Sequence, residues 1–301
     1  MTMKNILVIG GSYFTGRVYS ILASKEECLR LHVVNRGTYP LNLPNVTEYR
    51  CDRHDAERLA ETLPEMVFDA AIDFCAYMPG ETETIAKALD GRIGHYVFFS
   101  TASVYRPAKG FLNESAQLLH SFGSDETGRY LAGKAALEDE ARKTGLPWTI
   151  LRPAFIYGPY NYAPREAWFI EQIVRGRAVL FPEDAAGRWS FVYVADIAKV
   201  LIAIAGDKRA FGKNYNLAGK ETVDYSLLME QLERCWGKPV QKQTMTCRQA
   251  DSAGIPLPFP LDGDVLYDGS RVVCDFGVGY TLLQFGMEKT FGAFRSVFEK
   301  N

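Results

Sequence analysis

An unbroken apolar run that leads directly into a pair of glycines constrains the fold more than any other stretch. Residues Ile6–Ile9 precede Gly10-Gly11, and a helical pattern begins near Thr15-Gly16. A short run that is apolar at every position predicts a strand buried on both faces, as in a parallel sheet. The glycines permit a tight turn, and the N-terminus of the following helix favours a pyrophosphate. The stretch predicts a dinucleotide-binding strand, turn and helix, although the same turn also suits simple packing and Tyr13 stands at its middle glycine position.

Strand and helix signals alternate through the first half of the chain. Strands are predicted at Leu31–Asn35, Val46–Cys51, Met66–Cys75, His95–Ser100 and Trp148–Tyr157, and helices at Ala56–Leu63, Glu81–Leu89 and Arg129–Lys143. Such alternation predicts an α/β fold with a doubly wound, Rossmann-like parallel sheet. The rhythm loosens later, with helices predicted at Arg165–Arg177, Asp196–Ile204, Tyr225–Trp236 and near Met287–Phe298, and strands at Phe191–Val194 and Tyr215–Gly219. We expect a dinucleotide-binding domain over residues 1–160 and mainly a smaller, substrate-binding lobe over 161–301, with some elements returning to the main sheet.

Composition excludes several classes of partner. The formal net charge of the 301 residues is −2, which gives no electrostatic reason to expect nucleic acid or an anionic membrane as a partner. Six scattered cysteines and four histidines show no spacing typical of metal ligands, so we expect reduced thiols and no metal site. No signal-peptide core or transmembrane run is visible, and we expect a cytoplasmic protein.

One predicted helix carries a tyrosine and a lysine on the same face. Tyr130 and Lys134 lie four residues apart, whereas Pro107 interrupts the similar pair Tyr105 and Lys109. A lysine ammonium beside a phenol favours the phenolate and lowers its pKa, which suits a general acid/base that serves a substrate oxygen. Taken alone, the pair is better explained as an exposed helical contact without a role.

Hydroxyl side chains at a strand end favour the catalytic interpretation. The fifth predicted strand ends in Ser100-Thr101, at the edge where doubly wound sheets bind ligands. Thr101 is placed to hydrogen-bond the same substrate oxygen that Tyr130 protonates. A β-branched residue chosen only for its strand propensity is the alternative.

Taken together, these motifs resemble the extended, atypical short-chain dehydrogenases/reductases of the NAD-dependent epimerase/dehydratase family. The resemblance spans most of the chain. It includes the glycine turn, Ser100–Tyr105, Tyr130-x-x-x-Lys134 and the Arg-Pro to Gly-Pro segment Leu151–Pro159, with the later markers Phe191–Asp196 and Tyr215–Gly219.

The resemblance implies a set of site residues. Catalysis is implied for Tyr130, Lys134 and Thr101. Cofactor binding is implied for Gly10, Ser12, Tyr13, Phe14, Thr15, Gly16, Asn35, Arg36, Asp52, Phe74, Cys75, Ala76, Ser100, Lys134 and Pro153. Substrate contacts are implied for Tyr77, Ser103, Phe155 and Arg188. We also expect the segment Tyr157–Ala163 to border the substrate pocket, with Phe155, Tyr157, Tyr160 and Tyr162 as an apolar lining.

Departures from the family pattern refine these expectations. Asn35-Arg36-Gly37 stands where NAD-binding members often carry an acidic residue, which slightly favours NADP over NAD as the NAD(P) cofactor. The same triplet, with the bulky residue in the glycine turn, resembles atypical members related to the chloroplast stem-loop-binding proteins. Ala102-Ser103 replaces the Asp-Glu of sugar-nucleotide 4,6-dehydratases, and Arg188 is one residue out of register with a diphosphate-binding arginine.

Two functions therefore compete. The first is an NAD(P)-dependent oxidoreductase or epimerase that acts on a hydroxyl or ketone carbon of a sugar, a sugar nucleotide or a similar small molecule. The second is a cofactor-binding regulatory or RNA-binding protein of the same fold without turnover. For the first we expect a small-molecule substrate and no nucleic-acid or membrane partner, with a homodimer as one assembly that the sequence permits.

Overall fold

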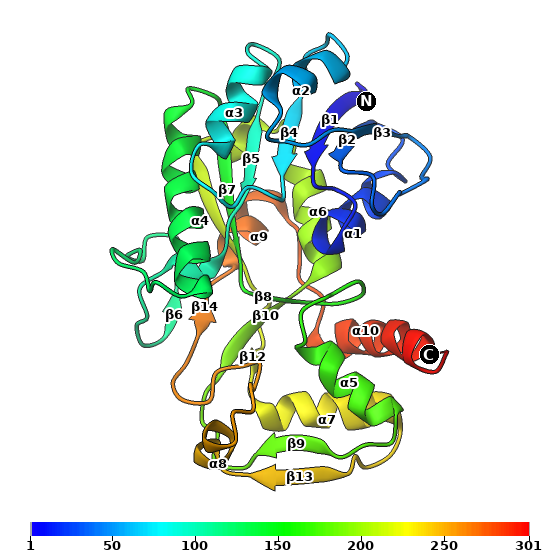
Figure 1. The fold of residues 1–301 in the computed structure, drawn as a ribbon, viewed down its shortest axis with the longest axis vertical. Coiled ribbons are helices and arrows are strands. Elements are labelled where there is room, and N and C mark those ends of the chain that lie inside the picture. The colour runs from blue at the N-terminus through cyan, green and yellow to red at the C-terminus, as the bar shows by residue number, and fades with distance from the viewer. Residues whose placement is uncertain (1, 301) are drawn as a thin grey trace.

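A computed structural model describes residues 2–300 of the chain (Figure 1). Within this range seven parallel strands form the central sheet, in the order β11-β7-β5-β4-β1-β2-β3. Their bounds are β1 (Lys4–Ile9), β2 (Leu29–Asn35), β3 (Val46–Arg50), β4 (Ala70–Asp73), β5 (Tyr96–Phe99), β7 (Trp148–Pro153) and β11 (Lys213–Leu217). The strand order reverses between β1 and β4, which makes that point the expected ligand crevice of a doubly wound sheet. The predicted fold class is confirmed.

Helices cover both faces of this sheet (Figure 1). One face packs on α1 (Phe14–Ala23), α6 (Val194–Ile204) and α9 (Ser270–Phe276), and the other on α2 (Ala56–Thr62), α3 (Glu81–Ala88) and α4 (Glu126–Lys143). Strand β1 shows why: Ile6 and Val8 join the first apolar cluster, whereas Leu7 and Ile9 join the second. The apolar run of the sequence is a strand with two buried faces.

The predicted strand Trp148–Tyr157 is wrong in its length and is two strands. β7 ends at Pro153, and β8 (Phe155–Tyr157) pairs instead with β10 (Trp189–Tyr193). The chain leaves the main sheet at Ala154. The prediction missed this break because an apolar run does not reveal which sheet a strand pairs with. The predicted strand Met66–Cys75 is likewise shorter in the structure, at Ala70–Asp73.

The second half of the chain builds a lobe beside the carboxyl ends of the main strands (Figure 1). Its small sheets join β12 (Thr222–Val223) to β10 and β8, β9 (Val179–Pro182) to β13 (Lys242–Met245), and β6 (Phe111–Leu112) to β14 (Leu266–Tyr267). Its helices are α5 (Glu166–Val174), α7 (Tyr225–Trp236), α8 (Cys247–Ser252) and α10 (Leu283–Phe298). Short 3₁₀ turns occur at Ala102–Val104 and Lys208–Ala210.

The lobe adds a group of aromatic side chains to the apolar cluster that it shares with the main sheet, and within this group Trp189 and Phe259 stack with ring centroids 4.5 Å apart. Two elements from the second half of the chain belong to the main domain: β11 pairs with β7, and α6 packs against α1. Across residues 2–300, no helix has the length and apolar character needed to cross a membrane.

Candidate active site

A cavity of about 1130 Å³ opens at the carboxyl ends of the main strands. It brings together nearly all the predicted site residues: Gly10, Ser12, Tyr13, Phe14, Thr15, Gly16, Asn35, Arg36, Asp52, Phe74, Cys75, Tyr77, Ser100, Thr101, Ser103, Tyr130, Lys134, Pro153 and Phe155. Ala76 and Arg188 are not among its lining residues. The fold therefore gathers most of the predicted residues around one cavity, and their roles remain predictions.

The glycine turn forms one end of this cavity. Gly10 has φ +82°, and a Cβ atom there would lie 2.8 Å from the Cys75 Sγ. A Cβ atom at Gly16 would lie 2.6 Å from the Gly10 carbonyl oxygen. Only glycine fits either position, so the turn brings the start of α1 directly against β1.

The N-terminus of α1 fits an anionic ligand. No side chain caps this helix and its first turn holds no acidic residue. Asp55, Asp125 and Asp224 cap α2, α4 and α7, whereas α3, α5, α6, α9 and α10 also lack a side-chain cap. Phe14, Thr15 and Gly16 from the first turn line the cavity. Uncapped N–H groups at a positive dipole end suit the pyrophosphate of a dinucleotide.

Lys134 is buried beneath the cavity floor, at 2% exposure. Its ammonium donates to the carbonyl oxygens of Ala76, at 2.9 Å, and Phe99, at 2.7 Å. Desolvation lowers the pKa of Lys134 to about 8, although Asp73 opposes the shift. Ala76 thus contributes its carbonyl oxygen to the lysine, and its predicted contact with the cofactor remains a prediction.

Tyr130 lies above Lys134 with 39% of its surface exposed. Desolvation of the hydroxyl raises the pKa of Tyr130 to about 12, while hydrogen bonding to Thr101 acts in the opposite direction. The expectation that Lys134 lowers this pKa is wrong for the present geometry. The lysine Nζ lies 5.9 Å from the centroid of the tyrosine ring and uses its donors on strand-end carbonyls.

A buried ion pair fixes α4, and with it Tyr130 and Lys134, onto the sheet. The Glu138 carboxylate accepts from Arg152 Nε at 2.9 Å and from the Ser100 hydroxyl at 2.8 Å. Arg152 also donates to the Tyr105 hydroxyl at 2.7 Å. The predicted cofactor residue Ser100 therefore joins β5, β7 and α4 at the cavity wall.

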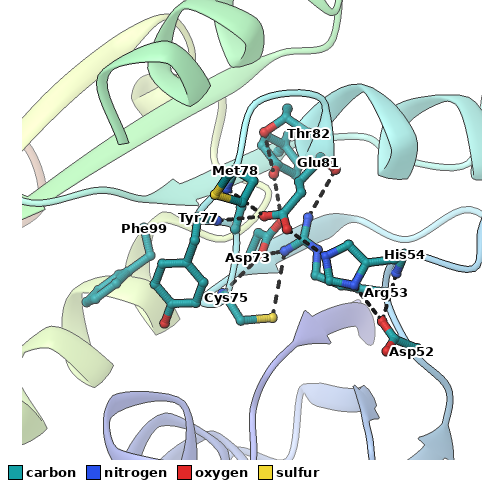
Figure 2. Close-up of polar contacts among 12 residues, drawn as sticks. Asp52, Arg53, His54, Asp73, Cys75, Tyr77, Met78, Glu81, Thr82 and Phe99 are labelled. Atoms are coloured by element: carbon teal, nitrogen blue, oxygen red, sulfur yellow. Dashed lines mark hydrogen bonds and ion pairs between the residues drawn. The ribbon is translucent and has the colours of Figure 1, made fainter. Parts of the chain in front are cut away.

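A group of acidic and basic side chains, Asp52, Arg53, His54 and Glu81, also lines the cavity (Figure 2). Asp52, predicted at the adenine, contacts His54 Nδ1 at 2.7 Å, and His54 Nε2 lies 2.6 Å from Glu81. These contacts, with Glu81 first, raise the pKa of His54, and hydrogen bonds from His54 lower the pKa of Asp52. The sequence reading missed His54 and Glu81, because they lie 27 residues apart and meet only through the fold.

Next to the Asp52, His54 and Glu81 contacts, the buried Arg53 guanidinium pairs with the Asp73 carboxylate at 2.6 Å (Figure 2). Asp73 also accepts from the Cys75 backbone at 3.1 Å and from the Tyr96 hydroxyl at 2.8 Å. The pair holds the turn after β4, whose residues Phe74 and Cys75 line the cavity.

The end of β2 presents no carboxylate to the cavity. The Asn35 side chain is occupied locally, since it donates to Glu48 at 2.9 Å and accepts from the Gly37 backbone at 2.7 Å. Arg36 and Thr38 line the cavity beside it.

Comparison with known proteins identifies the family. Residues 6–218 match the model of the NAD dependent epimerase/dehydratase family. The chain belongs to this family. It is 27% identical over 252 residues to the chloroplast stem-loop binding protein of 41 kDa b of Arabidopsis thaliana, covering 78% of this chain but only 64%, less than two thirds, of that protein.

Solved structures show the same fold. UDP-glucuronic acid 4-epimerase from Bacillus cereus, in complex with UDP-glucuronic acid and NAD, superposes with a TM-score of 0.78 at 17% identity, over 97% of this chain and 99% of that one. dTDP-glucose 4,6-dehydratase from Bacillus anthracis, in complex with NAD, superposes with a TM-score of 0.79 at 19% identity, over 98% of each chain.

In this family member the cavity contains only part of the predicted aromatic lining. Tyr77, Ser103, Phe155 and Tyr162 line it, but Tyr157 is buried and Tyr160 is exposed outside the lining. Arg188 is exposed and pairs with Asp264 on the surface, outside the cavity lining, while its backbone carbonyl accepts from Val265 at 2.7 Å.

A different arginine supplies the cation at this end. Arg165 lines the cavity and lies over the Phe155 ring at 5.1 Å from its centroid. Sequence reasoning missed it, since an arginine at the start of a predicted helix carries no distinguishing signal. Among residues 2–300, no cluster of three or more His, Cys, Asp or Glu side chains is arranged to hold a metal ion.

Proposed function

We propose that the chain is an NAD(P)-dependent epimerase or oxidoreductase that acts on a hydroxyl or ketone carbon of a sugar nucleotide or a related small molecule. The observation that carries this proposal is one cavity joining the uncapped N-terminus of α1 to Tyr130 and Thr101. The structural similarity to the epimerase from Bacillus cereus, which was solved in complex with UDP-glucuronic acid and NAD, supports it.

The residues have distinct roles in this proposal. Tyr130 moves a proton on or off the substrate oxygen, and Thr101 hydrogen-bonds the same oxygen. Lys134 contributes charge at the nicotinamide ribose from the cavity floor, and Asp52 meets the adenine. When bound, the nicotinamide nucleotide supplies or accepts the hydride at the substrate carbon.

Epimerisation or reduction fits this chain better than dehydration. Ala102 and Ser103 follow Thr101, so the Asp-Glu acid/base pair for eliminating water is missing there. The 1130 Å³ of the cavity exceed the usual range for a single drug-sized ligand, which suits a dinucleotide and a substrate together.

The first test is calorimetric titration with NAD and NADP, in both redox states. We expect one of them to bind, with a modest preference for NADP because Arg36 faces the cavity and no acidic residue follows β2. Arg36→Ala should weaken NADP binding and leave NAD binding nearly unchanged. If Arg36→Ala weakened the binding of NAD and NADP equally, Arg36 would not be the residue that binds the 2′-phosphate. If the wild-type protein bound neither dinucleotide, the proposed function would be wrong.

Binding of RNA without turnover is the second candidate. The name of the Arabidopsis relative, a stem-loop binding protein, is the observation in its favour, whereas the net charge of −2 opposes it. Micromolar, salt-dependent retention of a stem-loop RNA, without hydride exchange to any carbonyl substrate, would favour this candidate over the first.

A further inference from the structure

Three tyrosine rings form a continuous stack along the cavity. The Tyr13 ring stacks on Tyr39 with centroids 5.3 Å apart and planes at 16°. Its other neighbour is Tyr162, at 4.9 Å and 26°. Phe14 adds an edge contact to Tyr162 at 5.9 Å. These contacts connect the glycine turn to two later segments of the chain, one more than 20 residues away at Tyr39 and one more than 140 residues away at Tyr162.

Each tyrosine comes from a different part of the fold. Tyr13 precedes α1, Tyr39 follows β2, and Tyr162 lies in the 158–165 segment that leads into the C-terminal lobe. All three line the cavity and remain 47–63% exposed, with Tyr13 lowest and Tyr162 highest. Stacked aromatic pairs of this kind contribute stability beyond their burial, which helps to hold the three segments together beside the cavity.

The segment that carries Tyr162 is anchored at its base. Asn161 is 5% exposed and donates to the buried carboxylate of Glu166 at 2.9 Å. Glu166 also accepts from the Gly158 backbone at 3.1 Å. Tyr162 therefore extends from a fixed support, and it is near enough to Tyr130 to raise the pKa of that residue further.

Arg17 contacts parts of the same segments on the outside, away from the cavity. Arg17 donates to the carbonyl oxygens of Ser12, at 3.3 Å, and Pro40, at 3.4 Å. Its guanidinium also lies 5.5 Å from the centroid of the Tyr160 ring. Tyr160, two residues before Tyr162, thus contacts α1 from outside while Tyr162 faces the cavity.

We propose that Tyr39, Tyr13 and Tyr162 form an aromatic clasp that retains the bound dinucleotide between half-reactions, a role that rests on the proposed function. The three rings line the cavity next to the glycine turn. In this proposal, the dinucleotide leaves past the turn only when Tyr13 separates from one of its stacked neighbours. An epimerase needs this retention, because the hydride taken from the substrate must return to the same molecule. It also explains why a tyrosine replaces the middle glycine of the turn.

The test measures how fast the bound reduced dinucleotide leaves. The full-length protein is loaded with NADPH or NADH, whichever binds more tightly, and mixed with excess oxidised dinucleotide while nicotinamide fluorescence is followed. Tyr162→Ala should accelerate release about 2- to 10-fold, the loss expected for one aromatic pair. Tyr162→Phe keeps the ring and should release within about twofold of the wild-type rate. Tyr160→Ala, from the same segment but outside the cavity lining, is the matched control and should release at the wild-type rate.

The outcomes separate the two levels of the proposal. If the wild type binds a dinucleotide but Tyr162→Ala releases it at the wild-type rate, the clasp is wrong and the proposed function stands. Equal acceleration by Tyr160→Ala also overturns the clasp, because the effect then comes from loosening the segment. If the wild type binds neither dinucleotide, the proposed function fails and the clasp fails with it.

Discussion

Tyr130 places its hydroxyl beside Thr101 and above the buried Lys134, and the proposed proton transfer depends on that hydroxyl. Tyr130→Phe retains the ring and the helix but removes the proton. We expect turnover to fall about 10²- to 10⁴-fold, as for other general acid/base groups, with nearly unchanged dinucleotide affinity. Steady-state kinetics and calorimetry on the same preparation check this.

The control for that variant is Tyr160→Phe, since Tyr160 is exposed outside the cavity lining. Tyr105→Phe is unsuitable as a control. The Tyr105 hydroxyl accepts from Arg152 and donates to Asn216, both at 2.7 Å, so its loss would destabilise the fold. Full activity of Tyr130→Phe would show that another group moves the proton.

The lowered pKa of Lys134 predicts how the free energy of unfolding changes with pH. Its folded-state pKa is lowered to about 8 from an ordinary value of 10.5, so between these values the unfolded chain holds a proton that the folded chain has released. The free energy of unfolding should therefore rise with pH across this window, by at most about 3 kcal/mol. Urea unfolding at pH 8 and 10 should show a steeper rise for the wild type than for Lys134→Met. Identical pH slopes would contradict the lowered pKa.

At the scale of elements, the Glu138–Arg152 pair determines how α4 sits on the sheet. Glu138 is fully buried and Arg152 is 2% exposed, so removing one partner leaves a buried charge without compensation. Glu138→Leu should lower the free energy of unfolding by about 3–5 kcal/mol. The double variant Glu138→Leu/Arg152→Met should lose less than the sum of the two single variants. Additive losses in urea unfolding at pH 7 would mean that the two residues stabilise the fold independently.

The elements also show which features a sequence pattern reaches. The helix with Tyr130 and Lys134 was predicted at Arg129–Lys143 and spans Glu126–Lys143, because Asp125 caps it one turn earlier. Local apolar patterning sufficed for β1 and α7, whose contacts repeat along the sequence.

Long-range contacts were beyond that reach. Lys134 bonds carbonyls 58 and 35 residues away, and the His54–Glu81 and Arg53–Asp73 contacts likewise form only once β3, β4 and α3 have packed. The orientation of the Lys134 side chain depends on which backbone carbonyls at the strand ends accept its hydrogen bonds. The sequence therefore predicted which residues surround the cavity better than it predicted the pKa of Tyr130.

At the scale of the whole molecule, the two halves share one core. β11 extends the main sheet beside β7, and α6 packs against α1 on the face that β1 presents with Ile6 and Val8. The side chains Ile197, Val200, Leu201 and Ile204 of α6 are fully buried there. At about 1.5–3 kcal/mol each, these four contribute roughly as much as the 5–15 kcal/mol of net stability of a typical protein.

A fragment of residues 1–160 should therefore not fold by itself, even though it contains the glycine turn, Tyr130 and Lys134. It lacks α6 over the α1 face and leaves the β7 edge unpaired. We expect the fragment to show no cooperative thermal transition and no dinucleotide binding, whereas the full chain unfolds cooperatively. Dinucleotide at 100 times its Kd should stabilise the full chain by about 2.7 kcal/mol. Circular dichroism and calorimetry on both proteins make the comparison, and a cooperative, dinucleotide-binding fragment would show that the first 160 residues are an independent domain.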